Sequence, residues 1–138
     1  MTIVEVVVSL LLMALAVIVM GRLTETRIIE SESLNYQYTM QAADGMLYSI
    51  FKDFHECRDY TITHDINASS DTDIFTIAFD MGDAGAHIYA YDQYNYTFYY
   101  NGATQFKCED FMANGDRQHL YVSMKLANGE RLEYTIYR

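Results

Sequence analysis

The chain has 138 residues, which is enough for one small domain with a single core. Its net charge of −10, with no cluster of Lys and Arg, argues against a nucleic-acid partner, because phosphate binding needs clustered cations. Glu5 is the only ionisable side chain among residues 1–20. The composition therefore separates an apolar N-terminal segment from an ordinary polar remainder.

The apolar run at residues 3–20 is long enough, at about 1.5 Å per residue, to cross most of a bilayer core. It differs from an ordinary secretory signal peptide, because no basic region precedes it and no A-x-A cleavage site ends it. Within this run, Glu5 is costly in lipid unless it finds a cation, and the nearest one is an α-amino group of its own chain or of a neighbour. The other interpretation places Glu5 among the headgroups, where it simply favours the helix N-terminus.

Residues 1–11, Met1-Thr2-Ile3-Val4-Glu5 and then the mainly aliphatic run to Leu11, resemble the start of mature type IV pilins and type II secretion pseudopilins. The resemblance extends over residues 1–25. It implies that a prepilin peptidase removes a short basic leader and methylates Met1, and that Glu5 then forms an intersubunit ion pair with the N-terminus of an adjacent subunit. The family's usual first residue is phenylalanine, and many members have proline where Arg22 stands, so the type of filament stays open.

The resemblance also implies partners and a location. Other copies of the chain, or related pilin subunits, would form a helical filament with it, helped by prepilin peptidase and a membrane assembly machinery. The subunit would lie in the lipid bilayer of the cytoplasmic membrane before assembly, and afterwards in an extracellular or periplasmic filament. The alternative is a single-pass membrane-anchored extracellular binding or adhesion domain that does not polymerise.

After Gly21, apolar positions recur at steps of three and four residues, which predicts one face of an amphipathic helix. These positions are Tyr36, Met40, Ala43, Leu47, Ile50 and Phe54. Beyond Tyr60 the period changes to two, which predicts antiparallel strands. We therefore expect an α+β fold in which a long N-terminal α-helix packs on a C-terminal antiparallel β-sheet, as in pilins. The predicted parts are 1–21, a transmembrane or filament-core helix; 22–57, its amphipathic continuation; and 58–138, a globular sheet region.

The predicted strands cover residues 61–63, 74–79, 105–111, 120–126 and 131–137, together with a strand region at 87–100 that can contain a bend or turn at 92–95. A polar loop is expected at 65–73. Asn101-Gly102 and Asn128-Gly129 are the strongest turn signals, and the second joins the last two strands into a terminal hairpin.

Cys57 and Cys108 are the only cysteines, and they belong to no CxxC or metal-ligand pattern. In an exported domain an even pair of cysteines favours a disulfide, which we expect here. In a reducing cytosol the two would be small apolar residues.

The densest feature is the tyrosine-rich stretch from Tyr89 to Tyr100. Strand propensity and core packing explain most of it. Alternation places Tyr94, Tyr96 and Tyr100 on one side of a strand, where they form a candidate aromatic contact surface for a ligand or another subunit.

No pattern in the sequence indicates an enzyme, a metal site or a cofactor. The alternating polar run from Asp65 to Asp73 lacks the Gly and Glu that an EF-hand loop needs, so a solvated acidic loop is the favoured interpretation. The four histidines share no ligand spacing, and no nucleophile motif or phosphate-binding loop is present. We therefore expect a structural protein.

Overall fold

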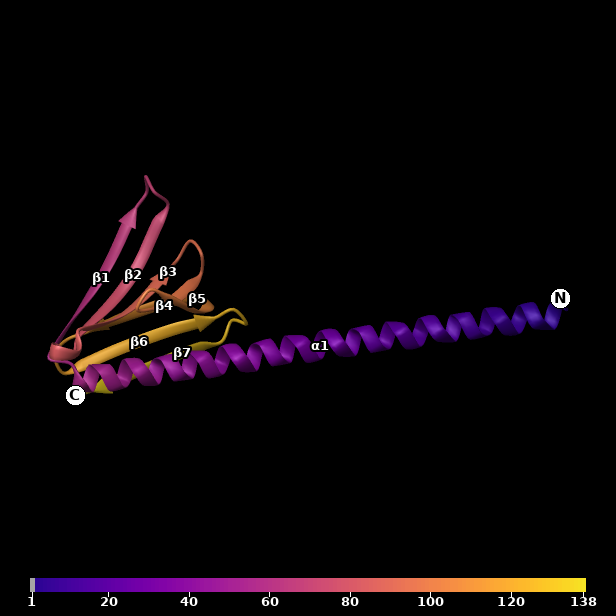
Figure 1. Ribbon diagram of the computed structural model, residues 1–138, viewed down its shortest axis with the longest axis horizontal. Coiled ribbons are helices and arrows are strands. Elements are labelled where there is room, and N and C mark those ends of the chain that lie inside the picture. Colours follow the sequence, from indigo (N-terminus) through magenta and orange to yellow (C-terminus); the bar gives the residue numbers. More distant parts are fainter. Residues whose placement is uncertain (1) are drawn as a thin grey trace. The chain divides into compact units, whose positions relative to one another are not determined.

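The computed structural model describes residues 2–138, so Met1 lies outside the described residues. One long helix, α1 (Ile3–Glu56), precedes seven strands and a short 3-10 turn, η1 (Gly82–Ala84) (Figure 1). The strands are β1 (Asp59–Asn67), β2 (Thr72–Asp80), β3 (Ala86–Asp92), β4 (Thr97–Tyr100), β5 (Ala103–Gly115), β6 (His119–Leu126) and β7 (Arg131–Tyr137). The predicted α+β class is confirmed.

The chain forms two compact units, and the boundary between them falls inside α1. The first unit ends at Gln37 and contains the apolar part of the helix. The second, Tyr38–Arg138, combines the remainder of α1 with the whole sheet. The helix runs through Asp44-Gly45 without interruption.

All seven strands form one sheet in chain order, and each strand is antiparallel to its neighbours. Asn101 and Gly102 have φ values of 47° and 79°, so the two-residue turn between β4 and β5 uses the left-handed region that Asn-Gly supplies. That predicted turn is confirmed. The predicted polar loop at 65–73 is largely absent, because β1 and β2 pair as far as Asn67 and Thr72.

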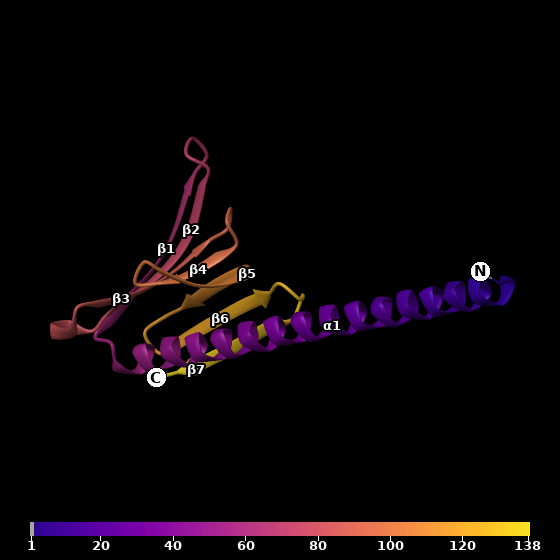
Figure 2. The ribbon, with the colours of Figure 1, turned by 45° about the vertical axis from the view of Figure 1, so that its right-hand side comes forward.

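The second unit buries one face of α1, at positions separated by three or four residues. The buried side chains are Ala43, Met46, Leu47, Ile50 and Phe54. In Figures 1 and 2 this part of α1 lies beside β6 and β7. The predicted amphipathic face is therefore confirmed from Ala43 onward, whereas Tyr36 is exposed.

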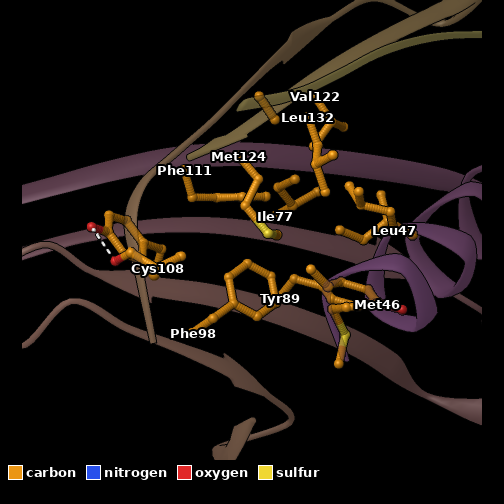
Figure 3. Close-up of a cluster of buried hydrophobic side chains, with 14 of the residues drawn as sticks. Met46, Leu47, Ile77, Tyr89, Phe98, Cys108, Phe111, Val122, Met124 and Leu132 are labelled. Carbon is orange, nitrogen blue, oxygen red and sulfur yellow. Dashed lines mark hydrogen bonds between the residues drawn. The ribbon is translucent and has the colours of Figure 1, made fainter. Parts of the chain in front are cut away.

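The sheet contributes a core that is rich in aromatic rings (Figure 3). The ring of Phe98 lies 4.8 Å from that of Phe111 and 5.4 Å from that of Phe106, measured between centroids. Tyr89 lies 5.7 Å from Phe79 across the β2–β3 pair. Edge-to-face and offset ring contacts of this kind add to the stabilisation that comes from burying the rings.

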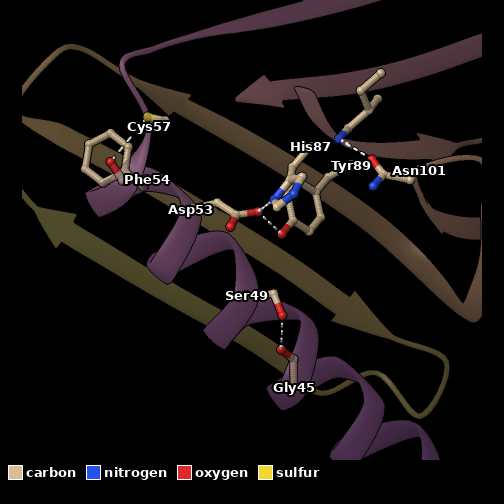
Figure 4. A network of polar contacts seen from close by, with 9 residues as sticks. Gly45, Ser49, Asp53, Phe54, Cys57, His87, Tyr89 and Asn101 are labelled. Atoms are coloured by element: carbon tan, nitrogen blue, oxygen red, sulfur yellow. Dashed lines mark hydrogen bonds and ion pairs between the residues drawn. The ribbon is translucent and has the colours of Figure 1, made fainter. Parts of the chain in front are cut away.

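A buried carboxylate ties the C-terminal part of α1 to β3 (Figure 4). Asp53 is only 5% exposed. Its Oδ2 accepts a hydrogen bond from the Tyr89 hydroxyl at 2.5 Å and lies 2.8 Å from Nδ1 of His87. Burial first, and then the hydrogen bond to Asp53, raises the pKa of Tyr89 well above its usual value, so the hydroxyl stays protonated as the donor.

The C-terminal residue secures the end of the same helix. The guanidinium of Arg138 donates a hydrogen bond to the carbonyl oxygen of Cys57 and lies over the ring of Phe54. A cation at this end of a helix also interacts favourably with the helix dipole.

Removing the contact between α1 and β3 should destabilise the second unit. We expect Asp53→Ala to lower the free energy of unfolding by about 2–3 kcal/mol, because it leaves the buried Tyr89 hydroxyl without its acceptor. Tyr89→Phe should lower it by about 1–2 kcal/mol, because Asp53 loses one hydrogen bond and keeps its contact with His87. The loss in the double variant should be smaller than the sum of the two single losses by at least about 1 kcal/mol. Urea unfolding of the full chain in lipid nanodiscs, followed by near-ultraviolet circular dichroism, measures this.

Asp44→Ala is the matched control, because Asp44 is exposed on the same helix. Its effect should stay within about 0.5 kcal/mol. Strict additivity of Asp53→Ala and Tyr89→Phe would contradict a direct interaction between the two side chains.

Candidate functional site

The apolar part of α1 is the first candidate site. The segment Ile3–Glu25 has 23 residues and a mean hydropathy of 2.9, and none of its side chains is buried within the chain. By length and composition it could span a membrane, although a signal sequence near an N-terminus has the same length and apolar composition. Its apolar residues face all sides of the helix, so it has no polar stripe to turn toward water.

Glu5 lies in the first turn of this helix. Its Oε2 accepts a hydrogen bond from the backbone N–H of Thr2 at 2.8 Å. Thr at the N-cap followed three residues later by Glu is the pattern of a capping box, in which the acid satisfies a free backbone donor. Glu5 therefore has a partner inside its own chain. The predicted partner, the amino group of Met1 in an adjacent subunit, lies outside the described residues.

The three tyrosines of the candidate aromatic surface occupy two different environments. Tyr94 and Tyr96 lie in the turn between β3 and β4 and are 53% and 54% exposed. Tyr100 lies on β4, opposite Tyr89 in the register, with its ring centroid 4.9 Å from that of Tyr89. Tyr94 and Tyr96 are thus both exposed in one turn, whereas Tyr100 packs against the core.

Cys57 and Cys108 are both buried and both free. Cys57 follows the last turn of α1, where its thiol contacts the carbonyl oxygen of Phe54 at 3.4 Å. Cys108 lies on β5, and burial raises the pKa of its thiol to about 12. The two side chains therefore act as small apolar core residues, and this corrects the expected disulfide.

The acidic run that follows Asp65 is divided between strands. Asp65 and Asn67 lie on β1, whereas Asp73 lies on β2 and pairs with His64 at 2.6 Å. Among the side chains that the structure describes there is no group of three or more His, Cys, Asp or Glu placed to hold a metal ion.

Two features of the structure were not predicted from the sequence. The first is the buried carboxylate of Asp53, although it lies three residues after Ile50 on the predicted apolar face, where a charged residue signals a buried interaction. The second is a group of residues that lines a groove beside β5 and includes Lys107, Lys125 and Arg131. Nothing in their spacing indicates that β5, β6 and β7 bring them together.

Comparisons with family models, with curated proteins and with solved structures found no match for this chain. The chemistry of its own residues therefore has to support a functional proposal.

The two thiols should be unreactive in the folded protein and become available together on unfolding. At pH 8 a pKa of about 12 leaves only about one Cys108 in ten thousand as thiolate, against about a tenth at the ordinary value of 9.0. A raised pKa favours the neutral thiol, so reactivity at Cys108 should grow only as the pH rises toward 12. Maleimide labelling followed by intact-mass analysis should find no adduct in the native chain and two in urea, without a reductant.

A disulfide would give a different pattern. The unfolded chain would then remain unlabelled until a reductant was added, which would contradict the free thiols.

Proposed function

We propose that this chain is a structural subunit of a type IV pilus-like or pseudopilus-like filament, and that it polymerises through its N-terminal apolar helix. The observation that carries the proposal is the segment Ile3–Glu25, which is apolar on all sides and has its only internal carboxylate at Glu5. The same helix continues into the second unit, where it supplies part of the core.

Before assembly this segment would anchor the subunit in the cytoplasmic membrane. At about 1.5 Å per residue, its 23 residues are about 34 Å long, which matches a hydrocarbon core of about 30 Å. Arg22 and Glu25 stand at its far end, where charged side chains can reach the headgroups.

In a filament the same apolar surface would pack against the helices of other subunits instead of lipid. Such an exchange is physically reasonable, because a helix that is hydrophobic all round is stable only where water is excluded, whether by lipid or by protein. The exposed surface of the second unit would then lie outside the helical bundle, in an extracellular or periplasmic filament, and its negative charge would keep it soluble.

Glu5 would determine the register between subunits. In the isolated chain its carboxylate is satisfied by the N–H of Thr2. In an apolar bundle a charged carboxylate needs a cation as well, since removing it from water costs several kcal/mol. The resemblance of residues 1–11 to mature pilins indicates the methylated amino group of Met1 in an adjacent subunit as that cation. Correct stacking would therefore be the arrangement that neutralises Glu5.

The alternative is a membrane-anchored extracellular binding domain that does not polymerise. The exposure of Tyr94 and Tyr96 in one turn favours it, and the capping contact with Thr2 gives Glu5 a purely local role. The two functions differ in what they require of Glu5, because a cap needs only an acceptor oxygen whereas an ion pair needs the charge.

Two substitutions at Glu5 separate these roles. Glu5→Gln keeps an oxygen that can accept from Thr2 but removes the charge, and Glu5→Ala removes both. For a filament subunit we expect both variants to insert into the membrane normally and to reach sheared filaments at least about tenfold less than the wild type, in cells with the native assembly machinery. Immunoblots of carbonate-washed membranes and of sheared filaments measure the two quantities.

Glu25→Gln is the matched control, because it removes the same charge at the other end of the apolar segment; it should assemble normally. Intact mass of the sheared subunit should also show one methyl group on the N-terminus. If Glu5→Gln assembles like the wild type and only Glu5→Ala fails, the ion-pair role is ruled out. If the wild-type chain never leaves the membrane fraction, the filament role is ruled out.

A further inference from the structure

A groove of about 640 Å³ lies beside β5. Five parts of the second unit line it: the β3–β4 turn with Tyr96, β5 with four residues, and β6, the β6–β7 turn and β7 with one residue each. The lining residues that matter here are Tyr96, Lys107, Glu109, Asp110, Lys125 and Arg131. The groove opens where the β5–β6 register shifts between Cys108 and Asp110, because this bulge changes the direction of the exposed side chains of β5.

Four of the charged side chains in the groove form two ion pairs. Lys125 forms an ion pair with Glu109, and Nη2 of Arg131 lies 3.7 Å from Oδ2 of Asp110. Nη1 of Arg131 also donates to the hydroxyl of Ser123, a residue that is only 1% exposed. The groove therefore presents both hydrogen-bond donors and acceptors, and each paired group has hydrogen-bonding capacity left over.

The turn that carries Tyr96 is held by several hydrogen bonds. The carboxylate of Asp92 accepts hydrogen bonds from the backbone N–H groups of Tyr94 and Asn95 and from the side-chain amide of Asn95. The carbonyl oxygen of Tyr96 accepts from the N–H of Cys108 at 3.0 Å, which joins the turn to β5. The position of the Tyr96 backbone is thus determined on both sides.

Tyr96 itself has an unfavourable backbone conformation. Its φ is 53°, in the left-handed region that a bulky residue rarely adopts and that Asn or Gly adopts easily. The geometry of the turn therefore does not require an aromatic residue at this position. The chain nevertheless has a tyrosine there, at a cost in backbone strain, and its ring is half exposed at the groove. Strained residues of this kind concentrate at sites that bind ligands.

We propose that this groove is a binding site for a neutral saccharide, with Tyr96 as the stacking surface. Sugar hydroxyls both donate and accept, which matches the two pairs of carboxylate and cation in the groove, and the C–H face of a sugar ring matches the exposed tyrosine ring. An anionic ligand would meet Glu109 and Asp110 on a chain of net charge −10. A cationic ligand would meet Lys107, Lys125 and Arg131. The site lies wholly within the second unit and does not depend on filament formation.

The test uses the full chain in phosphatidylcholine nanodiscs, which carry no sugar headgroup. The probe is a printed array of neutral hexose and N-acetylhexosamine oligosaccharides, with sialylated and sulfated glycans beside them. Titration calorimetry then measures the affinity of the strongest neutral oligosaccharide. We expect Tyr96→Asn to weaken its binding by about tenfold or more, because the ring is lost. The same variant should raise the melting temperature by about 3–6 °C, because asparagine tolerates the left-handed backbone.

Tyr94→Asn is the matched control. It makes the same change two residues earlier in the same turn, at a residue that does not line the groove, so binding should be retained and the melting temperature should not rise. The proposal is overturned if no neutral oligosaccharide binds, if only the acidic glycans bind, or if Tyr96→Asn binds as tightly as the wild type. The melting temperature of Tyr96→Asn is the folding control, because a variant at least as stable as the wild type can lose binding only through the lost ring and not through unfolding.

Discussion

The structure and the proposed functions of this protein depend on an apolar helix segment whose exposure to water is strongly unfavourable in free energy. Residues from Ile3 to Met20 present aliphatic side chains in every direction, with Glu5 as the only charge. Each exposed aliphatic side chain costs about 1.5–3 kcal/mol relative to burial, so the summed cost of leaving this segment in water exceeds the stability of a small domain. Lipid or other apolar helices must therefore surround it, and both proposed functions are answers to that requirement.

The second unit has a different requirement. It must stay folded in water, whether lipid or protein surrounds the apolar segment. Its core takes side chains from α1 only from about Met40 onward, and it closes them against the sheet. The hydrogen bond from Tyr89 to Asp53 and the contact between Arg138 and Cys57 secure the C-terminal end of that helix. One helix therefore serves two environments, since its first part is apolar throughout and its last part is amphipathic.

Much of this architecture follows from patterns in the sequence. The three- and four-residue spacing of Ala43, Leu47, Ile50 and Phe54 predicts the buried helix face, and Asn101-Gly102 predicts a turn that the structure contains. These predictions succeed because helix periodicity and left-handed turns are local properties. The length of β1 was underestimated, because the strand is extended by pairing with β2 and not by its own polar residues.

Features that depend on distant parts of the chain were harder to predict. Nothing local indicates that Asp53 finds Tyr89, or that Lys125 finds Glu109 across the bulge in β5. The expected disulfide failed for the same reason, because an even number of cysteines carries no information on where their thiols lie.

The central claim is that the apolar helix packs against other subunits and not only against lipid. Benzoylphenylalanine in place of Leu12, in the middle of the apolar segment, tests this directly in intact cells under ultraviolet light. The filament account predicts covalent adducts between the chain and other protein subunits, including a ladder of chain–chain products in the sheared fraction. Adducts with lipid alone would contradict it.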